Sequence, residues 1–67
     1  MTFQQVFNQL HRQKKVVEYK SLSSDKVHEM YCTIPRKFQS ESTKIIVWDL
    51  NEQNFHDIEV SSILSIR

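Results

Sequence analysis

The sequence predicts a mainly β domain of the α+β class, in which an N-terminal amphipathic helix precedes five short strands that form a small closed or partly open barrel. Two observations carry this prediction. Apolar residues at the start of the chain recur with the period of a helix, and from residue 16 onward the period changes to that of strands. A chain of 67 residues has room for one hydrophobic core, so residues 1–67 are expected to form a single domain.

The helix is expected to run from about Thr2 to Gln13. Thr2 followed three residues later by Gln5 is typical of a capping box, which pairs the side chain of each residue with the backbone N–H of the other. The apolar stripe packs either on the protein's own barrel or in the groove of a partner. Its members lie at i, i+3, i+4 and i+7: Phe3, Val6, Phe7 and Leu10.

Period-two alternation and turn residues predict the strands. Their expected ranges are 16–20, 27–34, 43–50, 55–60 and 64–67, with turns at 21–26 and 51–54 and a single 3₁₀ turn at 61–62. Pro35 ends the second strand, and the apolar run 43–50 predicts a central strand covered on both faces. Phe38 is expected to plug one barrel end. The predicted strand core is Met30, Cys32, Ile34, Val47 and Phe55.

Composition excludes several kinds of site. Glycine is absent, which rules out Gly-rich phosphate loops and leaves the tight turns to Asn, Asp or Ser. One cysteine and three histidines fall short of the four ligands of a structural zinc ion, so neither a cofactor nor a disulfide is expected. The first residues lack the apolar run of a signal peptide and no stretch approaches a membrane span, so we expect a cytoplasmic location and no membrane partner.

Charge is unevenly distributed along the chain. Residues 1–37 hold seven basic and three acidic side chains, a net charge of +4, whereas residues 38–67 hold two and five, a net charge of −3. A surface of both signs favours a specific protein partner over indiscriminate binding to a phosphate backbone.

Two sets of reactive side chains have both a functional and a simpler structural interpretation. Cys32, His28 and His56 could form a thiol nucleophile or a metal site, but His28 and Cys32 lie roughly 13 Å apart along a strand, so a buried, small apolar cysteine is favoured. Asp49, Asp57 and Glu59 could bind a hard cation, yet a solvated acidic face is the better interpretation.

Basic and aromatic residues alternate in two places, where phosphate contact and base stacking could combine. These are Arg36 and Lys37 with Phe38, and Lys14 and Lys15 with Tyr19, although solvated loops and core aromatics also account for them. Trp48 is expected in the core or at its rim, although an exposed edge would make it an interface anchor. The candidate interaction residues are Lys14, Lys15, Arg36, Lys37, Phe38 and Trp48.

The segments Met30-Tyr31-Cys32-Thr33-Ile34-Pro35 and Val47-Trp48-Asp49-Leu50, with Phe55 and the closing Ser62-Ile63-Leu64-Ser65-Ile66, form a recognisable pattern. Over residues ~16–67 it resembles a family of small bacteriophage proteins described as WYL-like Sm/SH3 barrels. The resemblance implies an SH3-like or Sm-like five-strand barrel and a phage accessory protein in the host cytoplasm. The acidic residues of strand 55–60 depart from that family, which weakens any implied nucleic-acid role.

The favoured function is a non-catalytic protein-binding module that modulates host or viral machinery. Its expected partner is a host or viral protein, and a homodimer is a further option for so small a domain. The alternative is a nucleic-acid-binding small barrel that acts in transcription or DNA topology, supported by the basic first half of the chain. An enzyme is the least favoured class.

Overall fold

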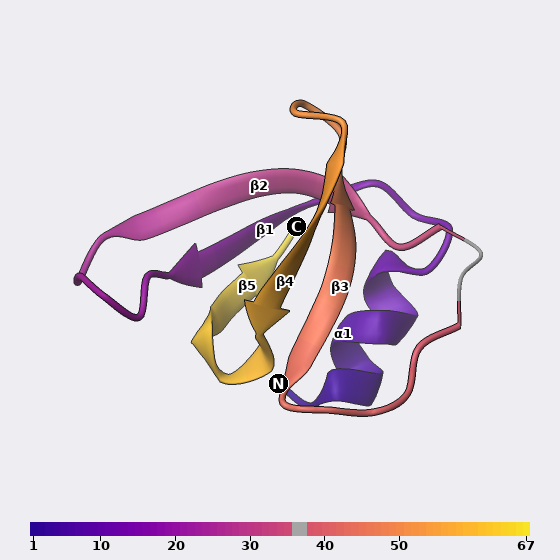
Figure 1. Ribbon diagram of the computed structural model, residues 1–67, viewed down its shortest axis with the longest axis horizontal. Coiled ribbons are helices and arrows are strands. Elements are labelled where there is room, and N and C mark those ends of the chain that lie inside the picture. The colour runs from indigo at the N-terminus through magenta and orange to yellow at the C-terminus, as the bar shows by residue number, and fades with distance from the viewer. Residues whose placement is uncertain (36–37) are drawn as a thin grey trace.

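The computed structural model describes residues 1–35 and 38–67. Its five strands form one antiparallel sheet in the order β4-β3-β2-β1-β5, with one helix at the N-terminus (Figure 1). This confirms the mainly β prediction. No pairing joins the edge strands β4 and β5 within the described residues, so the sheet is open. The elements are α1 Phe3–Leu10, β1 Lys15–Lys20, β2 Val27–Thr33, β3 Lys44–Asp49, β4 Asn54–Glu59, the 3₁₀ helix η1 Val60–Ser62 and β5 Ile63–Ile66.

The N-terminal helix begins as predicted and ends earlier. Thr2 Oγ1 accepts a hydrogen bond from the Gln5 N–H at 3.2 Å, and the Thr2 N–H donates to Gln5 Oε1 at 2.9 Å, which completes the capping box. The helix stops at Leu10 rather than Gln13, because the Leu10 carbonyl accepts the Ile34 N–H at 2.9 Å. The helix end is thereby joined to the chain that leaves β2.

The core lies between α1 and the concave face of the sheet. The helix stripe packs on its own sheet, and the predicted burial of Met30, Cys32, Ile34 and Val47 is confirmed. The buried hydrophobic residues are Phe3, Val6, Leu10, Val17, Met30, Cys32, Ile34, Ile45, Val47, Ile58, Val60 and Ile63.

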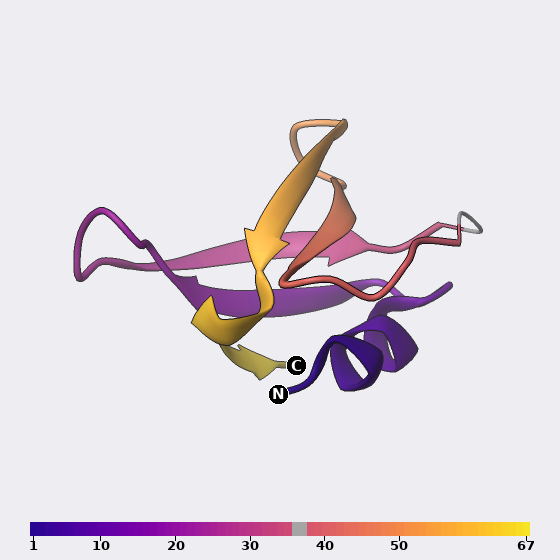
Figure 2. The ribbon, with the colours of Figure 1, turned by 60° about the horizontal axis from the view of Figure 1, so that its bottom comes forward.

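The sheet divides into two hairpins that project in different directions (Figures 1 and 2). Strands β1 and β2 pair along the whole of β1, from Lys15 to Lys20, whereas β2 and β3 pair only through Cys32 with Asp49 and Thr33 with Trp48. The rest of each hairpin therefore diverges from the other.

Beyond its short pairing with β2, strand β3 has a substitute neighbour. The Gln39 side chain donates from Nε2 to the Ile46 carbonyl at 2.9 Å and accepts the Ile46 N–H through Oε1 at 2.8 Å. Both backbone groups of Ile46 are thus satisfied by one amide, as an adjacent strand would satisfy them.

Two aromatic predictions are wrong. Phe55 is 52% exposed, because the β3–β4 register places it opposite Trp48 on the outer face. The same register places Ile58 opposite the buried Ile45, so Ile58 faces the core in its stead. Phe38 is 81% exposed and plugs nothing. Strand β3 is not covered on both faces either, since Ile45 and Val47 are buried while the residue between them is exposed.

The prediction for turn residues is also incomplete. Arg12 and Gln53 adopt positive φ angles of 60° and 57°, in the left-handed region that a glycine would occupy at less cost. Within residues 1–35 and 38–67, the chain without glycine accepts this strain at Arg12, after α1, and at Gln53, in the turn that precedes β4.

Candidate functional site

An apolar patch covers the outer face of the β3–β4 hairpin, and we call its residues Ile46, Trp48 and Phe55 the hairpin patch. Trp48 and Phe55 face each other across the two strands with ring centroids 4.7 Å apart and an interplanar angle of 71°, an edge-to-face contact. Ile46 is 42% exposed and Trp48 is half-buried. A small hollow of about 20 Å³ beside the patch is lined by Ile34, Pro35, Gln39, Ile46 and Phe55.

The predicted interaction residues do not all meet at this patch. Trp48 belongs to it, while Phe38 is exposed on the loop next to Gln39, whose side chain binds β3. Lys14 is exposed and Lys15 is half-buried at the start of β1. Arg36 and Lys37 lie outside the described residues.

Lys14 and Lys15 do not form one surface with Tyr19, with which the sequence interpretation combined them. Tyr19 lies at the other end of β1, roughly 13 Å from Lys15 at the rise of a strand, and stacks on His28 with centroids 5.5 Å apart.

A cleft of about 390 Å³ opens where the two hairpins diverge. The buried side chains of Met30 and Ile58 line it, together with the stacked Tyr19 and His28 of the β1–β2 hairpin. Charged and titratable side chains of both signs come from the other hairpin: Lys44, His56, Asp57 and Glu59.

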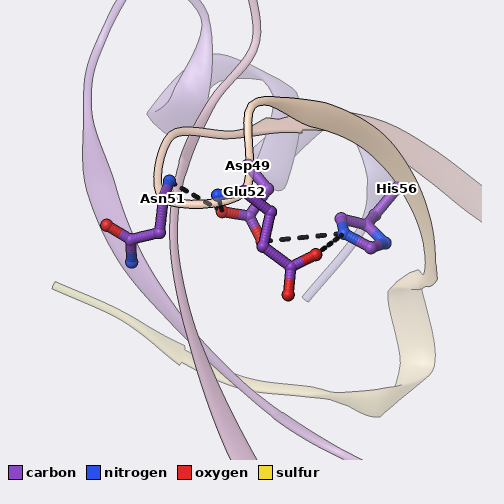
Figure 3. A network of polar contacts seen from close by, with 4 residues as sticks. All are labelled: Asp49, Asn51, Glu52 and His56. Atoms are coloured by element: carbon purple, nitrogen blue, oxygen red, sulfur yellow. Dashed lines mark hydrogen bonds and ion pairs between the residues drawn. The ribbon is translucent and has the colours of Figure 1, made fainter.

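A second group of side chains occupies the inner side of the β3–β4 turn: Asp49, Glu52 and His56, the turn cluster (Figure 3). His56 Nε2 lies 3.3 Å from Glu52 Oε2 and 3.6 Å from Asp49 Oδ2. One ligand atom from each residue lies within 4.8 Å of the other two, and a histidine with two carboxylates is a donor set that can hold a divalent cation.

Asp49 is not part of a solvated acidic face, which corrects the sequence interpretation. Its side chain is 9% exposed, and its Oδ1 accepts the backbone N–H groups of Asn51 at 2.9 Å and Glu52 at 3.0 Å. The carboxylate thus holds the turn that separates β3 from β4. Asp57 is exposed and Glu59 half-buried.

The sequence interpretation also missed Glu52 and its link to His56. The signal was the D-x-x-E-x-x-x-H spacing around a predicted turn, because Asp49 and His56 lie diagonally across the hairpin on one face and Glu52 lies in the turn between the strands.

Cys32 is fully buried between strands, as predicted for a packing residue. Burial, and secondarily the nearby Asp49 carboxylate, raise the pKa of the Cys32 thiol to about 11. At neutral pH the thiol is therefore protonated, and the thiolate needed for nucleophilic attack is absent. His28 does not join Cys32 and His56 in any metal-ligating group of the described residues.

Comparison with protein-family models, curated proteins and solved structures gave no match. In residues 1–35 and 38–67 there is no helix that is both long and apolar enough to cross a membrane.

Proposed function

We propose that this chain is a non-catalytic protein-binding module, and that the hairpin patch is its binding surface. The observation that carries the proposal is a tryptophan and a phenylalanine in edge-to-face contact on an outer strand face, with half of the Phe55 side chain in solvent. Aromatic side chains dominate the binding energy of protein interfaces, because they bury a large area at a small cost in conformational entropy. An apolar, rigid surface of this kind suits a partner that presents aliphatic or aromatic side chains.

Charge beside the patch favours a protein over a nucleic acid. Asp57 lies directly opposite Ile46 and Glu59 opposite Lys44 on the same outer face of the hairpin. Lys44 on this face forms an ion pair with Asp57 at 4.0 Å, which leaves one excess negative charge there. This charge repels phosphate and suits a basic side chain next to the apolar segment of a protein partner.

Nucleic-acid binding is the second candidate, and one observation favours it. The β1–β2 register begins with Lys15 opposite Cys32, and the next residue of β2, Thr33, pairs with Trp48. The exposed Lys14, which precedes Lys15, therefore lies near the end of the sheet that carries Trp48. A base stacked on Trp48 would have a phosphate contact within reach.

The wider setting of the proposal is a small barrel of SH3-like or Sm-like type, encoded by a phage and active in the host cytoplasm on host or viral machinery. The strand order and the 3₁₀ turn before β5 support the barrel type, and the sheet stays open between its edge strands β4 and β5. The sequence resemblance supports the phage setting.

A capture experiment tests the proposal with matched variants. Tagged protein is incubated with a bacterial lysate, with and without nuclease, and compared with Phe55→Ala and with Leu64→Ala, a control at a similarly exposed apolar residue of β5. We expect a partner that survives nuclease, is lost with Phe55→Ala and is retained with Leu64→Ala.

Two results would count against this function. A partner that disappears with nuclease and weakens with Lys14→Gln supports the nucleic-acid alternative. In that case the loss of one phosphate contact should also reduce the slope of log affinity against log salt concentration by nearly one unit. A partner that binds Phe55→Ala as well as the original chain removes the hairpin patch from the interface.

A further inference from the structure

We propose that the turn cluster is a binding site for a divalent first-row transition metal ion of the zinc type, held by Asp49 Oδ2, Glu52 Oε2 and His56 Nε2. This site lies on the inner side of the β3–β4 turn, so it stands apart from the hairpin patch on the outer face and does not depend on the proposed function.

The distances fit a small ion with little rearrangement. An ion with four ligands at about 2.0–2.1 Å places those ligand atoms about 3.3–3.4 Å from one another. The His56 Nε2 atom is 3.3 Å from Glu52 Oε2 and 3.6 Å from Asp49 Oδ2, so two of the three separations are already close to that value. The third separation is within 4.8 Å and closes by rotation of the exposed Glu52 side chain.

A second observation concerns the Asp49 carboxylate, whose two oxygens have different surroundings. Oδ1 is fixed by two backbone N–H groups of the turn, which orients Oδ2 towards His56 (Figure 3). His56 Nε2 is the neighbour of Oδ2 at 3.6 Å, and the Asp49 side chain is about nine-tenths buried. The carboxylate is therefore held in place beside the imidazole nitrogen, so a cation between the two atoms would meet ligands that are already positioned.

The donor set selects the class of ion. An imidazole nitrogen suits Zn²⁺, Ni²⁺, Cu²⁺ or Fe²⁺, whereas Mg²⁺ and Ca²⁺ require six or more oxygen ligands. Two carboxylates balance the two positive charges of the ion. Three protein ligands leave at least one coordination position for water or another donor, and His56 also lines the cleft, so a molecule held in the cleft would lie next to the ion.

Calorimetric titration of the untagged full chain with ZnCl₂, and separately with MgCl₂, tests this site. Asp49→Asn is the informative variant, because the amide oxygen still accepts the two backbone N–H groups of the turn while the anionic Oδ2 is lost. His56→Gln and Glu52→Gln remove the other ligands at partly or largely exposed positions. His28→Gln is the matched control, a histidine outside the cluster.

We expect one Zn²⁺ per chain, no comparable binding of Mg²⁺, and affinity weakened about tenfold or more by each cluster variant but not by His28→Gln. If Asp49→Asn does not fold, the other two cluster variants carry the test. The proposal is overturned by no zinc binding at millimolar concentration, by equal binding to the original chain and His56→Gln, or by loss of binding in His28→Gln. The first two outcomes would leave His56 as a polar neighbour of the two carboxylates and no more, and the third would place the zinc ion at a different histidine.

Discussion

Strand β4 holds two large apolar residues on opposite faces, Phe55 and Ile58, and their replacement by alanine should lower the free energy of unfolding by different amounts. Ile58 is 5% exposed and lies in register with Ile45, which is fully buried, whereas Phe55 is 52% exposed. We therefore expect Ile58→Ala to lower the free energy of unfolding more than Phe55→Ala, although phenylalanine is the larger side chain.

The magnitudes follow from burial. Truncation of a buried isoleucine costs about 2–5 kcal/mol, which includes the cavity that remains. Truncation of a fully buried phenylalanine costs about 3–5 kcal/mol. Roughly half of Phe55 is already in water, and its removal leaves no enclosed cavity. We therefore expect Phe55→Ala to lower the free energy of unfolding by about 1–2 kcal/mol, part of which comes from the lost edge contact with Trp48. A domain of this length has roughly 3–10 kcal/mol of stability in total.

Urea unfolding followed by circular dichroism measures both changes. A loss of about 5 kcal/mol exceeds the lower end of that stability, so Ile58→Val provides a graded second measurement with an expected loss of about 0.5–1.5 kcal/mol. A Phe55→Ala protein that is destabilised as much as Ile58→Ala would refute the outward placement of Phe55 and the hairpin patch with it.

Three further predictions concern single side chains. Burial and the Asp49 charge raise the pKa of the Cys32 thiol from 9.0 to about 11. The free energy of unfolding should therefore fall as the pH rises between these values, because only the unfolded chain then ionises the thiol. Urea melts at several pH values should show this fall in the original chain and lack it in Cys32→Ala. Gln39→Ala should lower the free energy of unfolding, measured with urea, by about 1–2 kcal/mol, because both backbone groups of Ile46 lose their amide partner. An unchanged midpoint would show that water replaces the Gln39 amide fully. Gln53→Gly should raise the thermal midpoint, because glycine adopts the positive φ of this turn without a Cβ clash. A lower midpoint would mean that the greater conformational entropy of glycine in the unfolded chain outweighs this relief of strain.

Local signals in the sequence predicted the helix and much of the core correctly. The capping box at Thr2 and the helical spacing of Val6 and Leu10 depend only on residues within one or two turns of each other. The end of the helix was missed because Leu10 binds Ile34, a partner distant in the sequence.

Strand β4 shows why the rest could not be predicted. Phe55 and Ile58 are an odd number of residues apart, so only one of them can face the core, and the sequence does not say which. The choice is made by the turn, which pairs Asp49 with Asn54 and so fixes the face of every later residue. Asp49 follows Val47 by two residues, so the alternation of the strand places both side chains on the inner face. The charge of Asp49 favoured an exposed position in the sequence interpretation, and that preference was wrong.

The same turn sets both candidate surfaces, because neighbouring residues of a strand point to opposite faces. Trp48 and Phe55 lie on the outer face, while Asp49 and His56, one residue further along each strand, belong to the inner turn cluster. A register slip of one residue would exchange the two surfaces together, whereas Asp49→Asn preserves the turn hydrogen bonds and changes only the inner one. Zinc binding and partner binding should therefore respond separately to Asp49→Asn and Phe55→Ala, and loss of both activities in either variant would point to a changed register rather than to a removed contact.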